Sequence, residues 1–142
     1  MEYRRFNDTY VIRMDRGEEI VSCLDRFCRQ EDIHLAHVQA IGAVDRAEVG
    51  LYDVETKAYR KQFFREPLEM TSLLGTVTRK DGQPYLHLHV TLTDASMLAH
   101  GGHANSLTIS GTCEMIVTVL EGDVERCPDE VTGLNLFSFD AD

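Results

Sequence analysis

Two histidines, His87 and His89, stand in a segment whose residue types alternate with a period of two. From Tyr85 to Thr93, leucine and valine side chains fill every second position, and the histidines lie among the polar positions between them. This alternation is typical of a strand with one buried face, so both imidazoles are expected on the same face, about 7 Å apart. Two imidazoles at that separation can turn toward one metal ion, which then needs a third ligand.

A third histidine, His103, follows after a short connection. The segment from Asp94 to His103 ends in the run His100, Gly101, Gly102, His103. The sequence predicts a loop here, because paired glycines allow a tight backbone path, and such a loop could carry a third imidazole back to the strand. Three neutral imidazoles suit Zn²⁺, and three protein ligands leave a fourth position for water or a substrate atom.

Two alternatives to a functional zinc site stay open. The histidines could simply be polar residues on a solvated face and in a loop, because His-x-His is frequent by chance. A bound ion could also tie strand and loop together without any turnover. A catalytic zinc would lower the pKa of bound water to about 7, and it would need a general acid or base nearby. Glu66, Glu69 and Asp94 are the candidates for that role, and the sequence does not place them.

The remaining histidines and the cysteines carry weaker signals. His34 and His37 begin a predicted strand, where His37 is expected to be a core or interface histidine and not a ligand. The cysteines form no CxxC pair and are expected to be reduced thiols. A zinc site made of all four is disfavoured, because structural zinc sites use shorter ligand spacings. The four are Cys23, Cys28, Cys113 and Cys127.

The composition is that of an ordinary globular domain. With 142 residues, of which 43% are hydrophobic and 27% charged, the chain is expected to form one domain over residues 1–142 with a substantial core. It has no apolar run long enough to span a membrane. The N-terminal residues lack the apolar segment of a secretory signal, so we expect a cytoplasmic protein. The net charge of −10 opposes binding to a nucleic-acid backbone.

The densest basic stretch runs from Tyr59 to Arg65 and mixes basic with aromatic residues. It could be a small patch for nucleic acid. The alternation within it favours a solvated strand whose aromatic side chains turn inward.

One helix and several strands must position these residues. Apolar side chains recur at helical spacing from Glu18 to Glu31, and Asp15 is available as a cap, so this segment is the predicted main helix. The pair Asp81-Gly82 predicts a hairpin that joins the preceding strand to the histidine strand. Strands are predicted over Phe6 to Met14, His34 to Val44 with a bend at Gly42, Ala47 to Val54, Ala58 to Arg65, Leu68 to Arg79, Tyr85 to Thr93, and Thr112 to Glu121.

The last segment, Val124 to Asp142, is predicted to pack as a tail. Together these elements predict an α+β fold in which a mainly antiparallel sheet of about six to eight strands packs with the one main helix, about Glu18–Glu31.

The order of motifs along the chain resembles the PPC domain that plants and prokaryotes share. After the helix come Gln-Ala-Ile-Gly-Ala-Val, a Tyr-Asp-x-Glu-Thr hairpin, Glu-Pro-Leu-Glu-Met-Thr-Ser-Leu-Leu-Gly, His87-x-His89-Val90 and Gly101-Gly102-His103. The resemblance spans nearly the whole chain. It implies a homotrimer of compact α+β subunits. It also implies that His87, His89 and His103 of each subunit bind a divalent metal ion near a subunit interface, with zinc as the first candidate. His100 falls where the family pattern varies and is the weaker ligand candidate.

In plants the same domain follows AT-hook motifs in nuclear DNA-binding proteins. This chain contains no Arg-Gly-Arg-Pro hook and no basic tail. It therefore lacks the segment that binds the DNA minor groove in the plant proteins. The expected function is therefore that of a stand-alone, trimeric, metal-binding PPC protein that binds or senses a small ligand. A DNA-binding or transcription-associated protein is the first alternative. A small zinc-dependent hydrolase or lyase is the second.

Overall fold

The structure is a computed structural model and describes residues 1–139. It contains one helix and nine strands, with 65% of the residues in strands. The predicted α+β class therefore holds only coarsely, since the sheet is larger than the expected six to eight strands. The strands are β1 (Glu2–Phe6), β2 (Thr9–Asp15), β3 (Ala36–Asp53), β4 (Ala58–Phe64), β5 (Leu68–Lys80), β6 (Gln83–Thr93), β7 (Ala99–Val119), β8 (Glu125–Pro128) and β9 (Asn135–Ser138).

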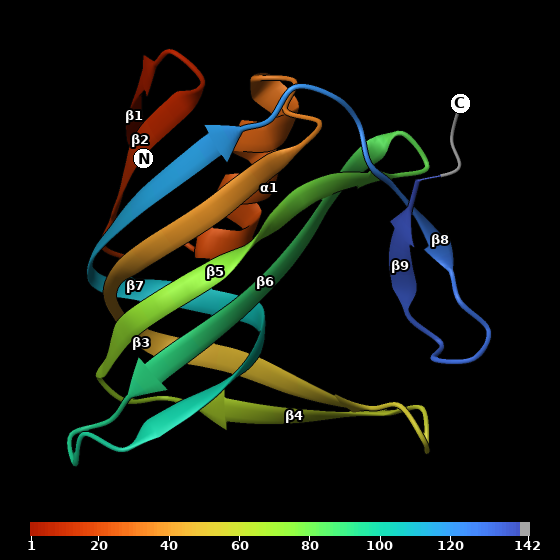
Figure 1. The fold of residues 1–142 in the computed structure, drawn as a ribbon. Helices are drawn as coiled ribbons and strands as arrows, with labels where there is room; N and C mark the ends of the chain where they lie inside the picture. Colours follow the sequence, from red (N-terminus) through yellow and green to blue (C-terminus); the bar gives the residue numbers. More distant parts are fainter. Residues whose placement is uncertain (140–142) are drawn as a thin grey trace.

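The helix α1 spans Ile20–Gln30 and lies on one side of the sheet (Figure 1). It is shorter than the predicted Glu18–Glu31, and Asp15 does not cap it, because strand β2 continues through Asp15. The cap is Glu19, whose carboxylate accepts hydrogen bonds from the first-turn backbone amides. The apolar stripe of the helix faces inward as predicted, through Ile20, Cys23, Leu24, Phe27 and Cys28.

The sheet runs in the order β1-β2-β7-β3-β5-β8-β9, with β4 paired to β3. Strand β6 pairs with β5 on one side and with the first residues of β7 on the other. Since β7 and β5 also flank β3, the four strands β3, β5, β6 and β7 pair in a closed ring. The histidine strand β6 and the first residues of β7 form an antiparallel hairpin across the short connection from Asp94 to Leu98, and the ring closes because the rest of β7 pairs with β3 (Figure 1).

Strand β3 differs from the two separate strands expected over this region. It is one element of 18 residues, and its pairing register shifts around Gly42, where a bend was predicted. A Cβ at Gly42 would lie 2.3 Å from the Thr112 carbonyl oxygen, so only glycine permits β7 to approach β3 at this point. The chain bends there without leaving the sheet.

The Asp81-Gly82 hairpin is as predicted and sets the register of β6. Both turn residues have positive φ, 51° and 72°, as a type I′ hairpin turn requires. In the antiparallel ladder that follows, Thr78 lies opposite Tyr85 and Thr76 opposite His87. The register therefore decides which side chains of β5 surround the histidines.

Other predictions at the two ends of the chain were too coarse. The single strand expected from Phe6 to Met14 is in fact the β1–β2 hairpin, which turns at Asn7 with φ 57°. The predicted tail contains the small hairpin β8–β9 up to Ser138, and its last residues lie outside the described part of the chain. The predicted inward orientation of the β4 aromatics is wrong for Tyr59 and Phe63, which are 41% and 60% exposed, and right for Phe64, which is partly buried against the core.

The core fills the space between α1 and the inner face of the sheet. Its largest fully buried side chains are Phe27, Ile12, Met14, Ile20, Leu24, Met70, Leu73, Leu88, Leu92, Leu107, Ile109 and Met115. Leu88 and Leu92 belong to the apolar positions of β6, so His87 and His89, at the alternate positions, point to the other face. Within residues 1–139, no helix is long and apolar enough to cross a membrane.

Candidate metal centre

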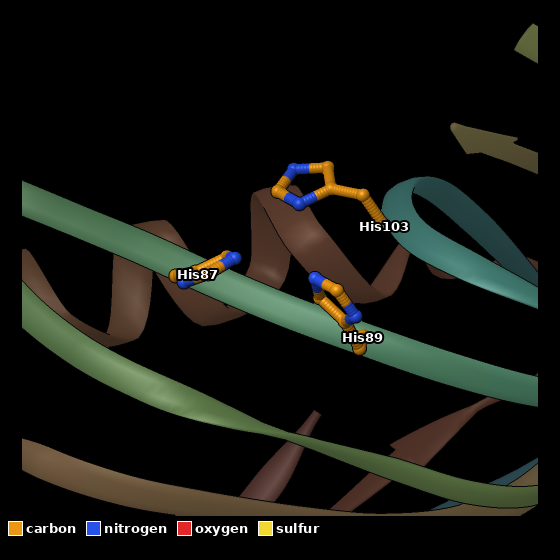
Figure 2. Close-up of side chains that lie close together, drawn as sticks. All are labelled: His87, His89 and His103. Carbon is orange, nitrogen blue, oxygen red and sulfur yellow. The ribbon is translucent and has the colours of Figure 1, made fainter. Parts of the chain in front are cut away.

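Strand pairing places the three histidines together on the face of the sheet that α1 does not cover. His89 on β6 lies directly opposite His103 on β7 in the antiparallel ladder, an arrangement that puts Cβ atoms about 4.5–5.5 Å apart. His87 is two residues before His89 and therefore shares its face. The three rings converge on one space between the two strands (Figure 2).

The distances between the three imidazole rings are close to those between histidines that share a bound metal ion. Ring centroids are 5.1 Å apart for His87 and His89, 5.5 Å for His87 and His103, and 5.7 Å for His89 and His103. One nitrogen of each ring lies within 4.8 Å of the others. Nitrogens around a tetrahedral zinc lie about 3.4 Å apart for Zn–N bonds of about 2.0–2.1 Å, so small ring rotations are sufficient. Across residues 1–139, this is the one group of three or more His, Cys, Asp or Glu side chains that could hold an ion.

The electrostatics of the cluster keep its nitrogens available as ligands. Partial burial of the His87 imidazole lowers its pKa to about 4, with smaller contributions from the positive charge of Arg126 and from the other two histidines. Burial lowers the pKa of His103 as well, and His89 adds to the effect. Both rings are therefore neutral at pH 7, and a neutral imidazole is the form that binds zinc.

The glycines before His103 belong to a strand, which corrects the loop predicted for this segment. Only Asp94 to Leu98 forms a connection, and β7 begins at Ala99. A Cβ at Gly101 would lie 2.7 Å from the Val90 carbonyl oxygen, and one at Gly102 would lie 2.5 Å from the Gly50 carbonyl oxygen. The glycines thus allow β7 to fit between β6 and β3. They position His103 through strand pairing and not through a turn.

Tyr59 borders the cluster on the β3–β4 side. Its ring stands edge-on to His103 at 6.4 Å between centroids, and its hydroxyl donates a hydrogen bond to Asn105 Oδ1 at 2.9 Å. The ring crosses β3 at Gly50, where any Cβ would lie 1.9 Å from the Tyr59 hydroxyl oxygen. A glycine at residue 50 is therefore needed to seat this tyrosine beside the site.

Arg126 lies near His87, whose pKa its charge helps to lower, and sequence reasoning missed it. It lies on β8, only 7% exposed, with its guanidinium carbon 4.7 Å from the centroid of the Tyr85 ring. Tyr85 precedes His87 by two residues on the same strand face, so the arginine lies next to the histidines. A single arginine in a four-residue strand has no periodicity to reveal it, and nothing in the sequence indicated this position.

The other candidate residues lie elsewhere. His100 Nε2 is 2.8 Å from Asp94 Oδ2, so this pair closes the connection before β7 and does not join the cluster. No carboxylate belongs to the three-histidine group, and Glu66 and Glu69 therefore stay outside it. His37 is exposed and not in the core. His34 lies between Asp32 and Asp123.

The cysteines form no metal site within the described residues. All four are free thiols, of which Cys23, Cys28 and Cys113 are buried and Cys127 is exposed. Burial raises the pKa of Cys28 and of Cys113 to about 12. The thiols of Cys28 and Cys113 are therefore uncharged packing groups.

Comparison with known proteins identifies the family of this chain. A metal-containing protein from Archaeoglobus fulgidus is 40% identical, with a TM-score of 0.86 and 96% of each chain covered. A candidate DNA-binding protein from Bacteroides thetaiotaomicron is 29% identical, with a TM-score of 0.96 over 99% of this chain and 98% of that one. Part of the bifunctional protein GlmU from Synechococcus sp. (strain JA-3-3Ab) is 32% identical over 127 residues, which are 87% of this chain and 19% of GlmU.

The chain thus spans about a fifth of the length of that curated relative, GlmU. The model of the Plants and Prokaryotes Conserved (PCC) domain matches residues 1–121, as the order of motifs predicted. The chain belongs to this family, the PCC or PPC domain family.

Proposed function

We propose that this protein binds one zinc ion per chain through His87, His89 and His103 and presents it to a small ligand. The observation that carries the proposal is the direct opposition of His89 and His103 across the β6–β7 ladder, with His87 on the same face. Three imidazoles leave a fourth zinc position for an oxygen of a ligand or of water. His87 and His89 are exposed, so this position is open to solvent.

Ligand binding has more support than turnover. A hydrolase or lyase would need a group that moves a proton near the metal-bound oxygen, and the candidates for that role, Glu66, Glu69 and Asp94, do not belong to the three-histidine group. The similarity to a metal-containing protein from Archaeoglobus fulgidus supports metal binding without indicating a reaction. We accordingly propose a sensing or carrier role in the cytoplasm, where the four free thiols would stay reduced.

Metal content per chain tests the proposal. Untagged protein purified without added metal should contain close to one equivalent of zinc by elemental analysis, or take it up when zinc is added. His87→Ala, His89→Ala and His103→Ala should each lose it. His100→Ala is the matched control, because His100 pairs with Asp94 at 2.8 Å, and it should keep the metal. A wild-type protein that cannot be loaded with zinc would refute the proposal, and equal loss in His100→Ala would show that the ligand set is wrong.

We propose further that the protein is a homotrimer, as its family resemblance implies. The sheet face that α1 leaves open has a hollow of about 830 Å³, and four large apolar side chains around it are 45–57% exposed. These are Phe6, Val11, Ile41 and Leu74. Exposed apolar groups gathered in this way are typical of a protein interface. Light scattering should give three times the mass of one chain, and Ile41→Glu should lower it, whereas a wild-type monomer would refute the trimer.

DNA association is the second candidate. Structural relatives described as candidate DNA-binding proteins favour it, as does strand β4, which exposes Tyr59, Arg60 and Phe63. The net charge of −10 opposes it, and Lys61 is paired with Glu48 at 2.6 Å. DNA binding through β4 would weaken steeply with added salt and with Arg60→Gln. If neither changes the binding, this candidate fails.

A further inference from the structure

Arg126 is a buried cation, and one of its three nitrogen atoms makes no hydrogen bond within the described residues. The guanidinium lies between two aromatic rings, with its carbon 4.7 Å from the Tyr85 centroid and 4.4 Å from the Phe137 centroid. Nε donates to Thr78 Oγ1 and Nη1 donates to the Asn135 carbonyl, each at 2.8 Å. Nη2 is buried and has no hydrogen-bond partner among residues 1–139.

This environment leaves the positive charge unneutralised. Both partners of the guanidinium are uncharged oxygens, and no carboxylate of the described residues forms an ion pair with it. Arginines are rarely buried without a paired anion, because a buried charge without one costs several kcal/mol. Two rings and two hydrogen bonds hold the side chain in place, and an anion is the partner that would both satisfy Nη2 and neutralise the charge.

The location of this charge connects it to the histidine cluster. Tyr85, which covers one side of the guanidinium, is separated from His87 by one residue on β6, so the two side chains share a face about 7 Å apart. Thr78, the partner of Nε, lies opposite Tyr85 in the β5–β6 ladder. The site thus combines a cluster of three metal-ligating histidines with a fixed positive charge, which lies against the side chain two residues before His87 on β6.

We propose that Arg126 is the anion-binding residue of the histidine site, and that the ligand is a small carboxylate. One carboxylate of this ligand would accept a hydrogen bond from Nη2. A second oxygen atom of the same ligand, about 7 Å from the first, would bind the metal. This inference rests on the proposed metal site and specifies its ligand. Nη2 is covered in this structure, so the ligand must displace part of the cover. Phe137, 45% exposed, is the more exposed of the two aromatic residues that lie against the guanidinium.

Titration calorimetry with linear dicarboxylates, from malonate to adipate, tests the inference. Zinc-loaded wild-type protein is compared with zinc-loaded Arg126→Gln and Arg126→Lys, and zinc content is measured after each titration to exclude chelation. Arg79→Gln is the matched control, because it removes one positive charge from the neighbouring strand β5, and the Arg79 guanidinium donates to the Gly82 carbonyl and not to the partners of Arg126. We expect at least one dicarboxylate to bind wild type and Arg79→Gln alike. Arg126→Gln should bind it about 10- to 100-fold more weakly, and Arg126→Lys should fall between.

A second arm uses wild-type protein only, because loss of Arg126 could unfold the β8–β9 hairpin. The half-amide of the best dicarboxylate lacks one charge at nearly constant shape, and it should bind about 10- to 100-fold more weakly than the diacid. This preference should disappear in a folded Arg126→Gln.

The outcomes separate the two proposals. If wild type binds zinc but no dicarboxylate of the series, or binds diacid and half-amide equally, the role of Arg126 is refuted and the metal site stands. Equal diacid affinity in wild type and Arg126→Gln refutes it too. If wild type cannot be loaded with zinc, the proposed function fails, and this inference fails with it.

Discussion

Alanine at Gly102 should push β7 away from β3 at the point where His103 is positioned. A Cβ there would lie 2.5 Å from the Gly50 carbonyl oxygen, whereas ordinary contact begins at 3.4 Å. The two strands must therefore separate by the difference, about 0.9 Å, because the atom approached is backbone and no side-chain rotation relieves the contact. Overpacking of this kind costs about 1–3 kcal/mol.

Gly111 provides a matched control on the same strand. A Cβ at residue 111 would lie 3.5 Å from the Ala43 Cβ, which is an ordinary contact, and alanine in a strand is favoured over glycine by about 0.5–1 kcal/mol. That gain is common to both variants, so Gly102→Ala and Gly111→Ala are expected to differ by the overpacking cost alone, roughly 1–3 kcal/mol in the free energy of unfolding. Only the first should also weaken zinc binding, because only it moves His103.

Urea denaturation followed by circular dichroism measures the stability difference, and a parallel zinc titration measures the effect on the site. The two variants share the substitution and the strand, so helix or strand propensity cancels between them. If Gly102→Ala is as stable as Gly111→Ala and binds zinc equally well, the close approach of β7 to β3 is not what positions His103.

Three other predictions concern the scaffold around the site. Glu19→Ala should lower the free energy of unfolding by about 1–2 kcal/mol, since Glu19 caps α1 and also accepts a hydrogen bond from the Leu107 amide at 2.9 Å; an unchanged urea midpoint would contradict this. Phe27→Ala should cost about 3–5 kcal/mol, because Phe27 is 1% exposed and packs edge-on against Tyr3 and Tyr10, whereas Phe63→Ala, at a position 60% exposed, should be nearly neutral. Hydrogen bonds to Asp32 and Asp123 raise the pKa of His34 above 6.5, so the stability that His34 contributes is present below pH 6.5 and is lost as the pH rises through the raised pKa. Denaturation across that range should show this decline in wild type and not in His34→Gln, and equal pH dependence of the two would contradict the assignment.

Local patterns in the sequence predicted most of the elements that carry the site. The alternation in β6 correctly gave a strand with His87 and His89 on its outer face, and Asp81-Gly82 correctly gave the β5–β6 hairpin. These signals are short in range, because they depend only on the pleat of one strand and on the φ values of two turn residues. The helix was also predicted, although its cap was assigned to Asp15, which the end of β2 occupies.

The features that were missed depend on contacts between segments far apart in the chain. Gly101 and Gly102 look like loop residues in the sequence, and only the approach of Val90 and Gly50 shows why a strand needs them. The direct pairing of His89 with His103 was missed because residues 94–103 were predicted as a loop, whereas β7 begins at Ala99 and pairs with β6 across the connection from Asp94 to Leu98. Arg126 lies in a strand of four residues, too short for any periodic pattern.

X-ray absorption at the zinc edge, on protein loaded with one equivalent of zinc, tests the central claim most directly. The histidine site predicts about three imidazole nitrogens at about 2.0–2.1 Å, a further light-atom ligand, and the multiple-scattering pattern of imidazole rings. His103→Ala should reduce the imidazole contribution by one or abolish binding. Sulfur at about 2.3 Å, or fewer than three imidazoles in the wild type, would contradict the claim that β6 and β7 together form the metal site.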